Sequence, residues 1–198
     1  AFDGSKGWSI ENFDWLFMVG GNVFVIFIIA LLFLPVGKVR LGGPDARPEH
    51  STIAWFGMLF AAGMGIGLMF WSVAEPTAYY TAWYGTPLGV TERTPEAYDL
   101  ALGATMFHWG LHPWAIYGVV ALSLAFFTFN KGLPLTIRST FFPIIGDAAW
   151  GWTGHIIDIV AVLATIFGLA TSLGFGAQQA ASGLAFLFDV PNTINTQI

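Results

Sequence analysis

The chain has 198 residues, of which 56% are hydrophobic and only 10% are charged, and its net charge is −5. Average soluble domains carry about a quarter charged residues, so this chain has too few charges to cover a soluble globule. The charges form no basic stripe, so nucleic acid is not an expected partner. The absence of cysteine excludes a disulfide framework and a thiolate metal site. We therefore predict a multi-pass protein of the cell membrane, in contact with the lipid bilayer.

Four runs with few or no charges are long enough to cross a hydrocarbon core, which requires roughly 20 helical residues. Helix is favoured over a β-barrel, because the runs are continuous and do not alternate in segments of about ten residues. We expect an all-α membrane protein with four transmembrane helices over about residues 15–36, 53–80, 100–129 and 155–188.

The basic residues predict the orientation of these spans. Lys38, Arg40 and Arg47 lie between the first two spans, and Lys131 and Arg138 lie between the last two. By the positive-inside rule both connections face the cytoplasm, so both ends of the chain face outward. An outward N-terminus without a signal sequence predicts an earlier helix. Residues 131–147 mix Pro, basic and aromatic residues, which indicates an amphipathic cytoplasmic segment.

The second span carries glycine at three alternate positions, Gly63, Gly65 and Gly67. Each glycine costs about 1 kcal/mol relative to alanine inside a helix, so the helix is weakened here. A broken helix would expose backbone carbonyls to a cation and amides to an anionic substrate. The alternative is helix packing, since Gly63 and Gly67 also form a GxxxG face. Farther along the span, Glu75 is a candidate for a capping, gating or substrate-binding role.

The third span carries a cluster of aromatic residues. Trp109, Trp114 and Tyr117 fall within an arc of roughly 140° on a helix, and Pro113 is expected to bend the helix inside that arc. A quaternary ammonium group cannot donate a hydrogen bond. It binds aromatic faces instead, through cation–π attraction of about 2 kcal/mol or more when desolvated. The alternative is an aromatic belt at the outer membrane interface.

Other polar positions in the spans have mainly structural interpretations. His108 and His112 are four residues apart, but no third metal ligand is evident, so packed or interfacial histidines are expected. The small and hydroxyl residues of 164–174 favour close helix contact, and their hydroxyls could also bind a sodium ion. No nucleophile–base pair, metal set or phosphate loop is visible, so we do not expect an enzyme.

Three segments, in this order, resemble the betaine/carnitine/choline transporter (BCCT) family, most closely its glycine betaine-type members. They read GMGIGLMFWSVAEP, then MFHWGLHPWAIYG followed by KGLPLTIRS, and then ATIFGLATSLGFGAQQ. The resemblance implies a twelve-helix transporter with a LeuT-like core of two inverted five-helix repeats, often assembled as a homotrimer. This chain resembles the second to fifth helices, and the resemblance favours the functional interpretation of the glycine and aromatic segments.

The resemblance also assigns residues to a substrate site. Trp109, Trp114 and Tyr117 match the family's aromatic box around a trimethylammonium group. The glycines of residues 63–67 match the unwound stretch beside the substrate. Gly67 is similar to the betaine-type pattern, whereas choline-type relatives tend to carry Asp at this position.

Sodium ligands are implied in the same way. The backbone carbonyls of Ala61 and Met64 match one sodium site of sodium-coupled members, and Thr165 matches a ligand of a second site. The hydroxyl expected four residues after Thr165 is replaced by Leu169, a departure that weakens the expectation of two sodium ions.

The resemblance therefore implies uptake of a quaternary ammonium compatible solute such as glycine betaine, coupled to sodium and serving osmoprotection. One alternative is sodium-independent or proton-coupled transport, or exchange, of choline, carnitine or dimethylsulfoniopropionate. An alternative from another class is a non-transporting membrane scaffold or an osmosensor module.

Overall fold

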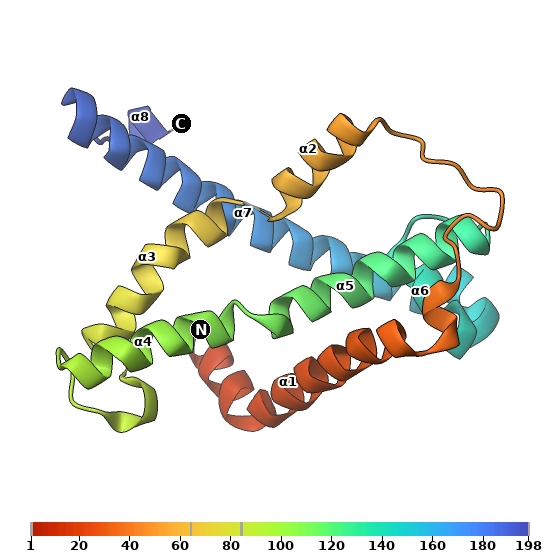
Figure 1. The fold of residues 1–198 in the computed structure, drawn as a ribbon, viewed down its shortest axis with the longest axis horizontal. Helices are drawn as coiled ribbons and strands as arrows, with labels where there is room; N and C mark the ends of the chain where they lie inside the picture. The colour runs from red at the N-terminus through yellow and green to blue at the C-terminus, as the bar shows by residue number, and fades with distance from the viewer. Residues whose placement is uncertain (1, 64, 84, 198) are drawn as a thin grey trace. The chain divides into compact units, whose positions relative to one another are not determined.

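The computed structural model describes residues 2–63, 65–83 and 85–197 (Figure 1). These residues form helices and turns, with one isolated β-bridge between Trp83 and Gly85. The α-helices are α1 (Phe2–Phe33), α2 (Thr52–Gly63), α3 (Ile66–Tyr80), α4 (Pro95–His108), α5 (Leu111–Ala125), α6 (Ile137–Ile145), α7 (Trp152–Phe188) and α8 (Ile194–Gln197). Short 3₁₀ segments cover Pro35–Lys38, Pro87–Gly89 and Gly146–Trp150, and one π-turn, η3, covers Phe126–Asn130.

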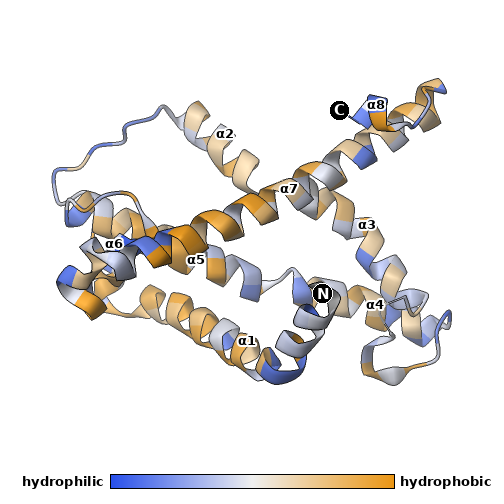
Figure 2. Cartoon of the chain, turned by 180° about the vertical axis from the view of Figure 1, so that it is seen from behind, coloured by the Kyte–Doolittle hydropathy of each residue, from blue (hydrophilic) through white to orange (hydrophobic). Residues whose placement is uncertain are grey.

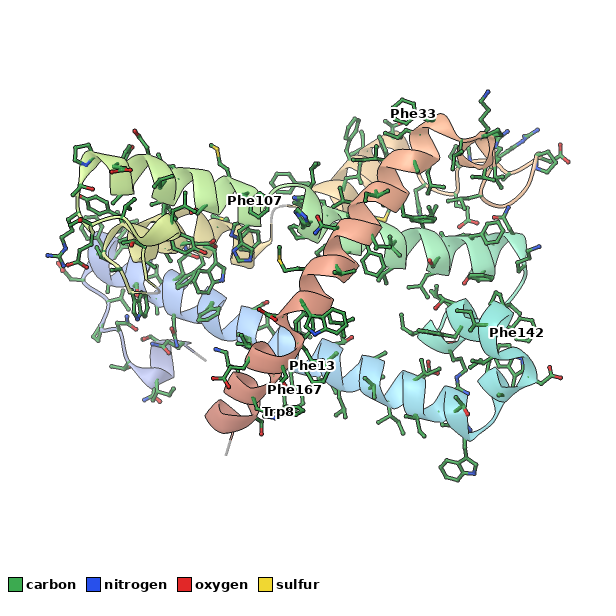
Figure 3. All side chains as sticks on the ribbon, turned by 90° about the horizontal axis from the view of Figure 1, so that it is seen from below. Trp8, Phe13, Phe33, Phe107, Phe142 and Phe167 are labelled. Atoms are coloured by element: carbon green, nitrogen blue, oxygen red, sulfur yellow. The ribbon has the colours of Figure 1, made fainter. Side chains whose placement is uncertain are left out.

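Four stretches of helix are long and apolar enough to cross a membrane, which confirms the expectation of an all-α membrane protein with four spans. They are Gly4–Phe33, Thr52–Tyr80, Pro95–Asn130 and Trp152–Phe188. Almost none of their residues are buried within the chain. Figure 2 shows the apolar colour along α1 and α7, and Figure 3 shows Trp8 and Phe33 near opposite ends of α1. Apolar side chains left uncovered on this scale are suited to contact with lipid and with neighbouring membrane helices.

The helices divide into two compact units, which are described separately. The first comprises Ala1–Ala46 and Met106–Ala149, and in it α1 packs along α5 (Figure 1). Glycine makes this approach close, because a Cβ built on Gly118 would lie 3.3 Å from Cδ1 of Ile28. Small residues of this kind are the usual means by which membrane helices come close together.

The second unit comprises Arg47–Thr105 and Trp150–Ile198, and in it α3 packs against α7. Aromatic rings form this contact. Phe70 stacks on Phe175, with ring centroids 4.8 Å apart and an interplanar angle of 12°, and Trp71 meets Phe175 edge-on at 5.7 Å. Offset-stacked and edge-to-face pairs are each worth about 0.5–1.5 kcal/mol beyond their buried area, so this cluster holds α3 on α7. Glu75 of α3 is buried, with 3% of its surface exposed.

A polar link joins the loop after α1 to the far end of the third span. The backbone N–H of Gly42 donates to Oδ1 of Asn130 at 2.9 Å, and Nδ2 of Asn130 donates to the carbonyl of Arg40 at 2.9 Å. Gly42 has a φ of +80°, a conformation that side chains with a Cβ rarely adopt. Asn130 therefore holds a basic loop against η3 through both ends of its amide.

This link generates the first prediction. In the full-length protein, Asn130→Ala should free the loop and speed trypsin cleavage after Lys38 and Arg40 several-fold, since both hydrogen bonds are lost. Cleavage is measured on inside-out vesicles, because the loop is predicted to face the cytoplasm. Asn130→Asp keeps the acceptor for Gly42 and should give an intermediate rate. Equal cleavage rates in all three proteins would contradict the link.

Candidate functional site

The aromatic cluster of the third span lies at a break between two helices. Helix α4 ends at His108 and α5 begins at Leu111, so Trp109 and Gly110 lie between them. Gly110 has φ −77° and ψ −128°, which is not helical. A Cβ built on Gly110 would lie 2.8 Å from the carbonyl oxygen of Met106, closer than real Cβ atoms come. The tight path of the chain at this break therefore depends on glycine.

The expectation that Pro113 bends a continuous helix is wrong, because the span is distorted at a different position. The break precedes Pro113, which is the third residue of α5, where a missing N–H costs little. In a continuous helix the N–H of residue 113 would donate to the carbonyl of Trp109. Proline has no N–H, and the Trp109 carbonyl instead accepts a hydrogen bond from Nε1 of Trp114 at 3.1 Å. The Trp109 carbonyl, which has no helical donor because residue 113 is proline, thus anchors the indole ring of Trp114.

The structure brings two of the three predicted aromatic residues into ring contact. The rings of Trp114 and Tyr117 have centroids 6.0 Å apart and an interplanar angle of 34°. Both remain open, with 47% of Trp114 and 69% of Tyr117 exposed. Trp109 joins them through its carbonyl, while its ring lies beside His108 at 5.7 Å. Their role as a substrate box stays a prediction.

The two histidines do not form part of a metal cluster in the described part of the chain. Over residues 2–63, 65–83 and 85–197, no group of three or more His, Asp or Glu side chains is arranged to hold a metal ion. Nε2 of His112 lies 3.1 Å from Oδ1 of Asn22 on α1. The sequence does not single out Asn22, because the contact joins residues 90 positions apart and follows no periodic pattern.

The glycine stretch of the second span, in the other unit, is also a helix break. Helix α2 ends at Gly63 and α3 begins at Ile66, and Gly65 is extended, with φ −65° and ψ 162°. A Cβ built on Gly65 or Gly67 would meet nothing within 4 Å. At these positions the structure therefore favours the broken helix over helix packing among the described residues.

The proposed sodium ligands fall around this break and on α7. Ala61 lies in the last turn of α2, and the final four carbonyls of a helix have no partner within it. Met64 lies outside the described residues. Oγ1 of Thr165 donates to the carbonyl of Ala161 at 2.8 Å, which leaves its lone pairs able to accept a cation, while Leu169 is exposed and offers no oxygen. The assignment of these residues to sodium stays a prediction.

Four apolar spans, two of them interrupted by short non-helical stretches, define a multi-pass membrane protein, and many transporters contain discontinuous helices of this kind. The profile of BCCT, the betaine/carnitine/choline family transporters, matches residues 1–198. The chain belongs to this family, whose members are multi-pass membrane transporters and not enzymes.

Curated relatives agree with this assignment. The chain is 69% identical to glycine betaine transporter 1 of Vibrio parahaemolyticus over all 198 residues, which cover 38% of that protein. It is 62% identical to a glycine betaine/proline/choline/ectoine transporter of the same species, covering 100% of the chain and 35% of the relative. It is 41% identical to the high-affinity choline transport protein of Escherichia coli, over 94% of the chain and 27% of the relative. The chain thus spans between 27% and 38% of the length of these relatives.

The break in the third span yields the second prediction. Gly110→Ala in the full-length protein should destabilise it by about 1–3 kcal/mol, because the added methyl group is forced against the backbone of α4. The measurement is the midpoint of thermal unfolding in detergent. Gly103→Ala is the matched control, since a Cβ there meets nothing within 4 Å and alanine favours the helix. Equal midpoints for the two variants would show that the break tolerates a side chain.

Proposed function

We propose that this chain forms part of a sodium-coupled importer of a quaternary ammonium solute such as glycine betaine. The observation that carries the proposal is the arrangement of Trp114 and Tyr117 at the α4–α5 break, with Trp114 anchored to the Trp109 carbonyl. The names of the relatives, which include glycine betaine and choline transporters, support the same class of substrate.

The aromatic residues suit the cationic end of such a solute. A trimethylammonium group offers methyl groups that carry partial positive charge and no N–H donor, so aromatic faces are its natural contacts. The open, adjacent rings of Trp114 and Tyr117 supply two such faces. The indole N–H of Trp114 is already donated to Trp109, which orients the ring and presents its apolar face.

The glycine break suits the anionic end. The first amides of α3 have no helical acceptor, and the N-terminus of a helix carries partial positive charge of roughly half an elementary charge. Discontinuous helices of transporters direct such N-termini at the carboxylate of a substrate. Gly67 adds no side chain at its own position in the first turn of α3. A zwitterion with a quaternary ammonium group and a carboxylate carries the two kinds of charged group that these segments would each suit.

The proposal of sodium coupling rests on three candidate oxygen ligands. The carbonyl of Ala61 in the last turn of α2, that of Met64 and the hydroxyl of Thr165 on α7 would provide neutral oxygen ligands of the kind that unwound transporter helices offer to Na⁺. Ion and substrate are coupled if both favour one conformation, because a ligand shifts an equilibrium only through its differential affinity. The remaining elements of the inverted repeats, and assembly as a homotrimer, belong to the full-length protein in this proposal.

The aromatic assignment is tested by Trp114→Ala in the full-length transporter. Loss of about 2 kcal/mol of cation–π attraction should raise the KM for glycine betaine about 30-fold. Uptake of radiolabelled glycine betaine by expressing cells is the measurement, with Trp152→Ala as the control, since Trp152 is an exposed indole at the start of α7. Near-normal uptake by Trp114→Ala would contradict the assignment of Trp114 to an aromatic box.

Coupling is tested by the sodium dependence of uptake in Thr165→Ala and Thr171→Ala. Both hydroxyls donate to a carbonyl four residues earlier, at 2.8 Å and 2.9 Å, so the variants are matched in their local bonding. We expect uptake to fall when potassium replaces sodium, and Thr165→Ala alone to raise the sodium concentration for half-maximal uptake several-fold. Uptake indifferent to sodium would favour proton coupling or exchange. No uptake of glycine betaine would direct the assay to choline, carnitine and sulfonium substrates.

A further inference from the structure

Helix α1 contacts the beginning of α5 through a hydrogen bond between two side chains. Nε2 of His112 and Oδ1 of Asn22 are 3.1 Å apart, and both residues lie within candidate membrane spans. Asn and His side chains that bond across membrane helices stabilise their association, because the lipid offers no competing partner. The contact lies two residues before Trp114, the ring that the proposed substrate site depends on.

The direction of this hydrogen bond is determined by a second one. Nδ2 of Asn22 donates to the carbonyl of Met18 at 2.8 Å, so Oδ1 is the atom of the amide that faces His112. An amide oxygen only accepts, and His112 must therefore donate through Nε2–H. A glutamine at position 112 has an amide group that can donate from a similar position, whereas leucine cannot donate at all.

The half-buried imidazole ring of His112 also has apolar neighbours. The ring of Phe107, labelled in Figure 3, lies with its centroid 5.3 Å from that of His112. On the α1 side, a Cβ built on the buried Gly21 would lie 3.4 Å from Cδ2 of His112, so the absence of a side chain lets α1 approach closely. The ring is thus held by a hydrogen bond, an aromatic neighbour and a close backbone.

Few backbone hydrogen bonds connect the start of α5 to the preceding turn. The span is broken at residues 109–110, and Pro113 cannot donate a backbone hydrogen bond to the preceding turn. At about 100° per residue, Trp114 and Tyr117 lie roughly 200° and 140° around α5 from His112. A helix held on the His112 face therefore presents the aromatic residues on the opposite side.

We propose that Asn22 and His112 are positioning residues for the substrate site: α1 holds the first turn of α5 and thereby orients Trp114 and Tyr117. This inference rests on the proposed function, because it requires the aromatic rings to bind the solute. It assigns a part in substrate affinity to α1, which carries none of the residues predicted to contact the substrate or sodium.

The experiment measures glycine betaine affinity of the purified full-length transporter by intrinsic tryptophan fluorescence, and KM and maximal rate by uptake. The variants are Asn22→Leu, His112→Leu, His112→Gln and the double leucine variant. Asn12→Leu is the matched control, since Nδ2 of Asn12 makes the same local bond, to the carbonyl of Trp8 at 2.7 Å. Trp114→Ala is measured alongside as the reference for the aromatic site.

We expect each single leucine variant to weaken affinity and raise KM about three- to tenfold, the size expected for an interhelical hydrogen bond in a membrane. The double variant should be no worse than the single ones, because the two residues share one interaction. His112→Gln and Asn12→Leu should retain affinity close to that of the parent. A merely structural role would lower the amount of folded protein and the maximal rate without this separation of KM from rate.

The outcomes distinguish this inference from the proposed function. Wild-type affinity in Asn22→Leu, or equal losses in His112→Leu and His112→Gln, overturns the positioning role while Trp114→Ala still reports on the aromatic site. Wild-type affinity in Trp114→Ala overturns both. If Asn22→Leu does not accumulate in the membrane, the comparison of His112→Leu with His112→Gln decides the question, because glutamine restores a donor that leucine lacks.

Discussion

A backbone group inside a membrane must find a partner within the protein, because each unpaired one costs several kcal/mol, and this chain interrupts two of its spans under that constraint. At the α4–α5 break, Pro113 leaves the carbonyl of Trp109 without its helical donor, and the indole of Trp114 takes the donor's place. The same bond that satisfies the backbone orients the ring predicted to bind substrate. At the α2–α3 break, one helix ends and another begins, and the sodium and carboxylate contacts we propose would satisfy backbone groups at these ends.

The first unit is held together by a few specific contacts and little apolar burial. Glycines at 21 and 118 allow α1 to lie close to α5, and two asparagine side chains then join distant parts of the chain. Asn22 meets His112 near the break, and Asn130 meets the basic loop at the other end of the span. In this arrangement α1 packs along α5, and the two polar links join the chain near the beginning of α5 and just after its end.

The four membrane spans are apolar and bury little of their surface against one another within the chain. Their side chains lie largely uncovered within the chain, which leaves them available to lipid and to neighbouring membrane helices. In the second unit the aromatic cluster of Phe70, Trp71 and Phe175 joins α3 to α7.

Much of this protein follows from its sequence alone. Long runs with few or no charges predict four membrane helices, since lipid permits few other forms of backbone. The GMGIG and HWGLHPW runs resemble the family and mark the two segments that we propose to bind ligands. Local pattern could not decide between packing and breakage at Gly63–Gly67, because the same glycines permit either. It placed the distortion of the third span at Pro113, whereas the close approach of Gly110 to the Met106 carbonyl locates it three residues earlier. Only the tertiary structure brings Asn22 to His112, because a contact across 90 residues depends on how two helices pack and leaves no period in the chain.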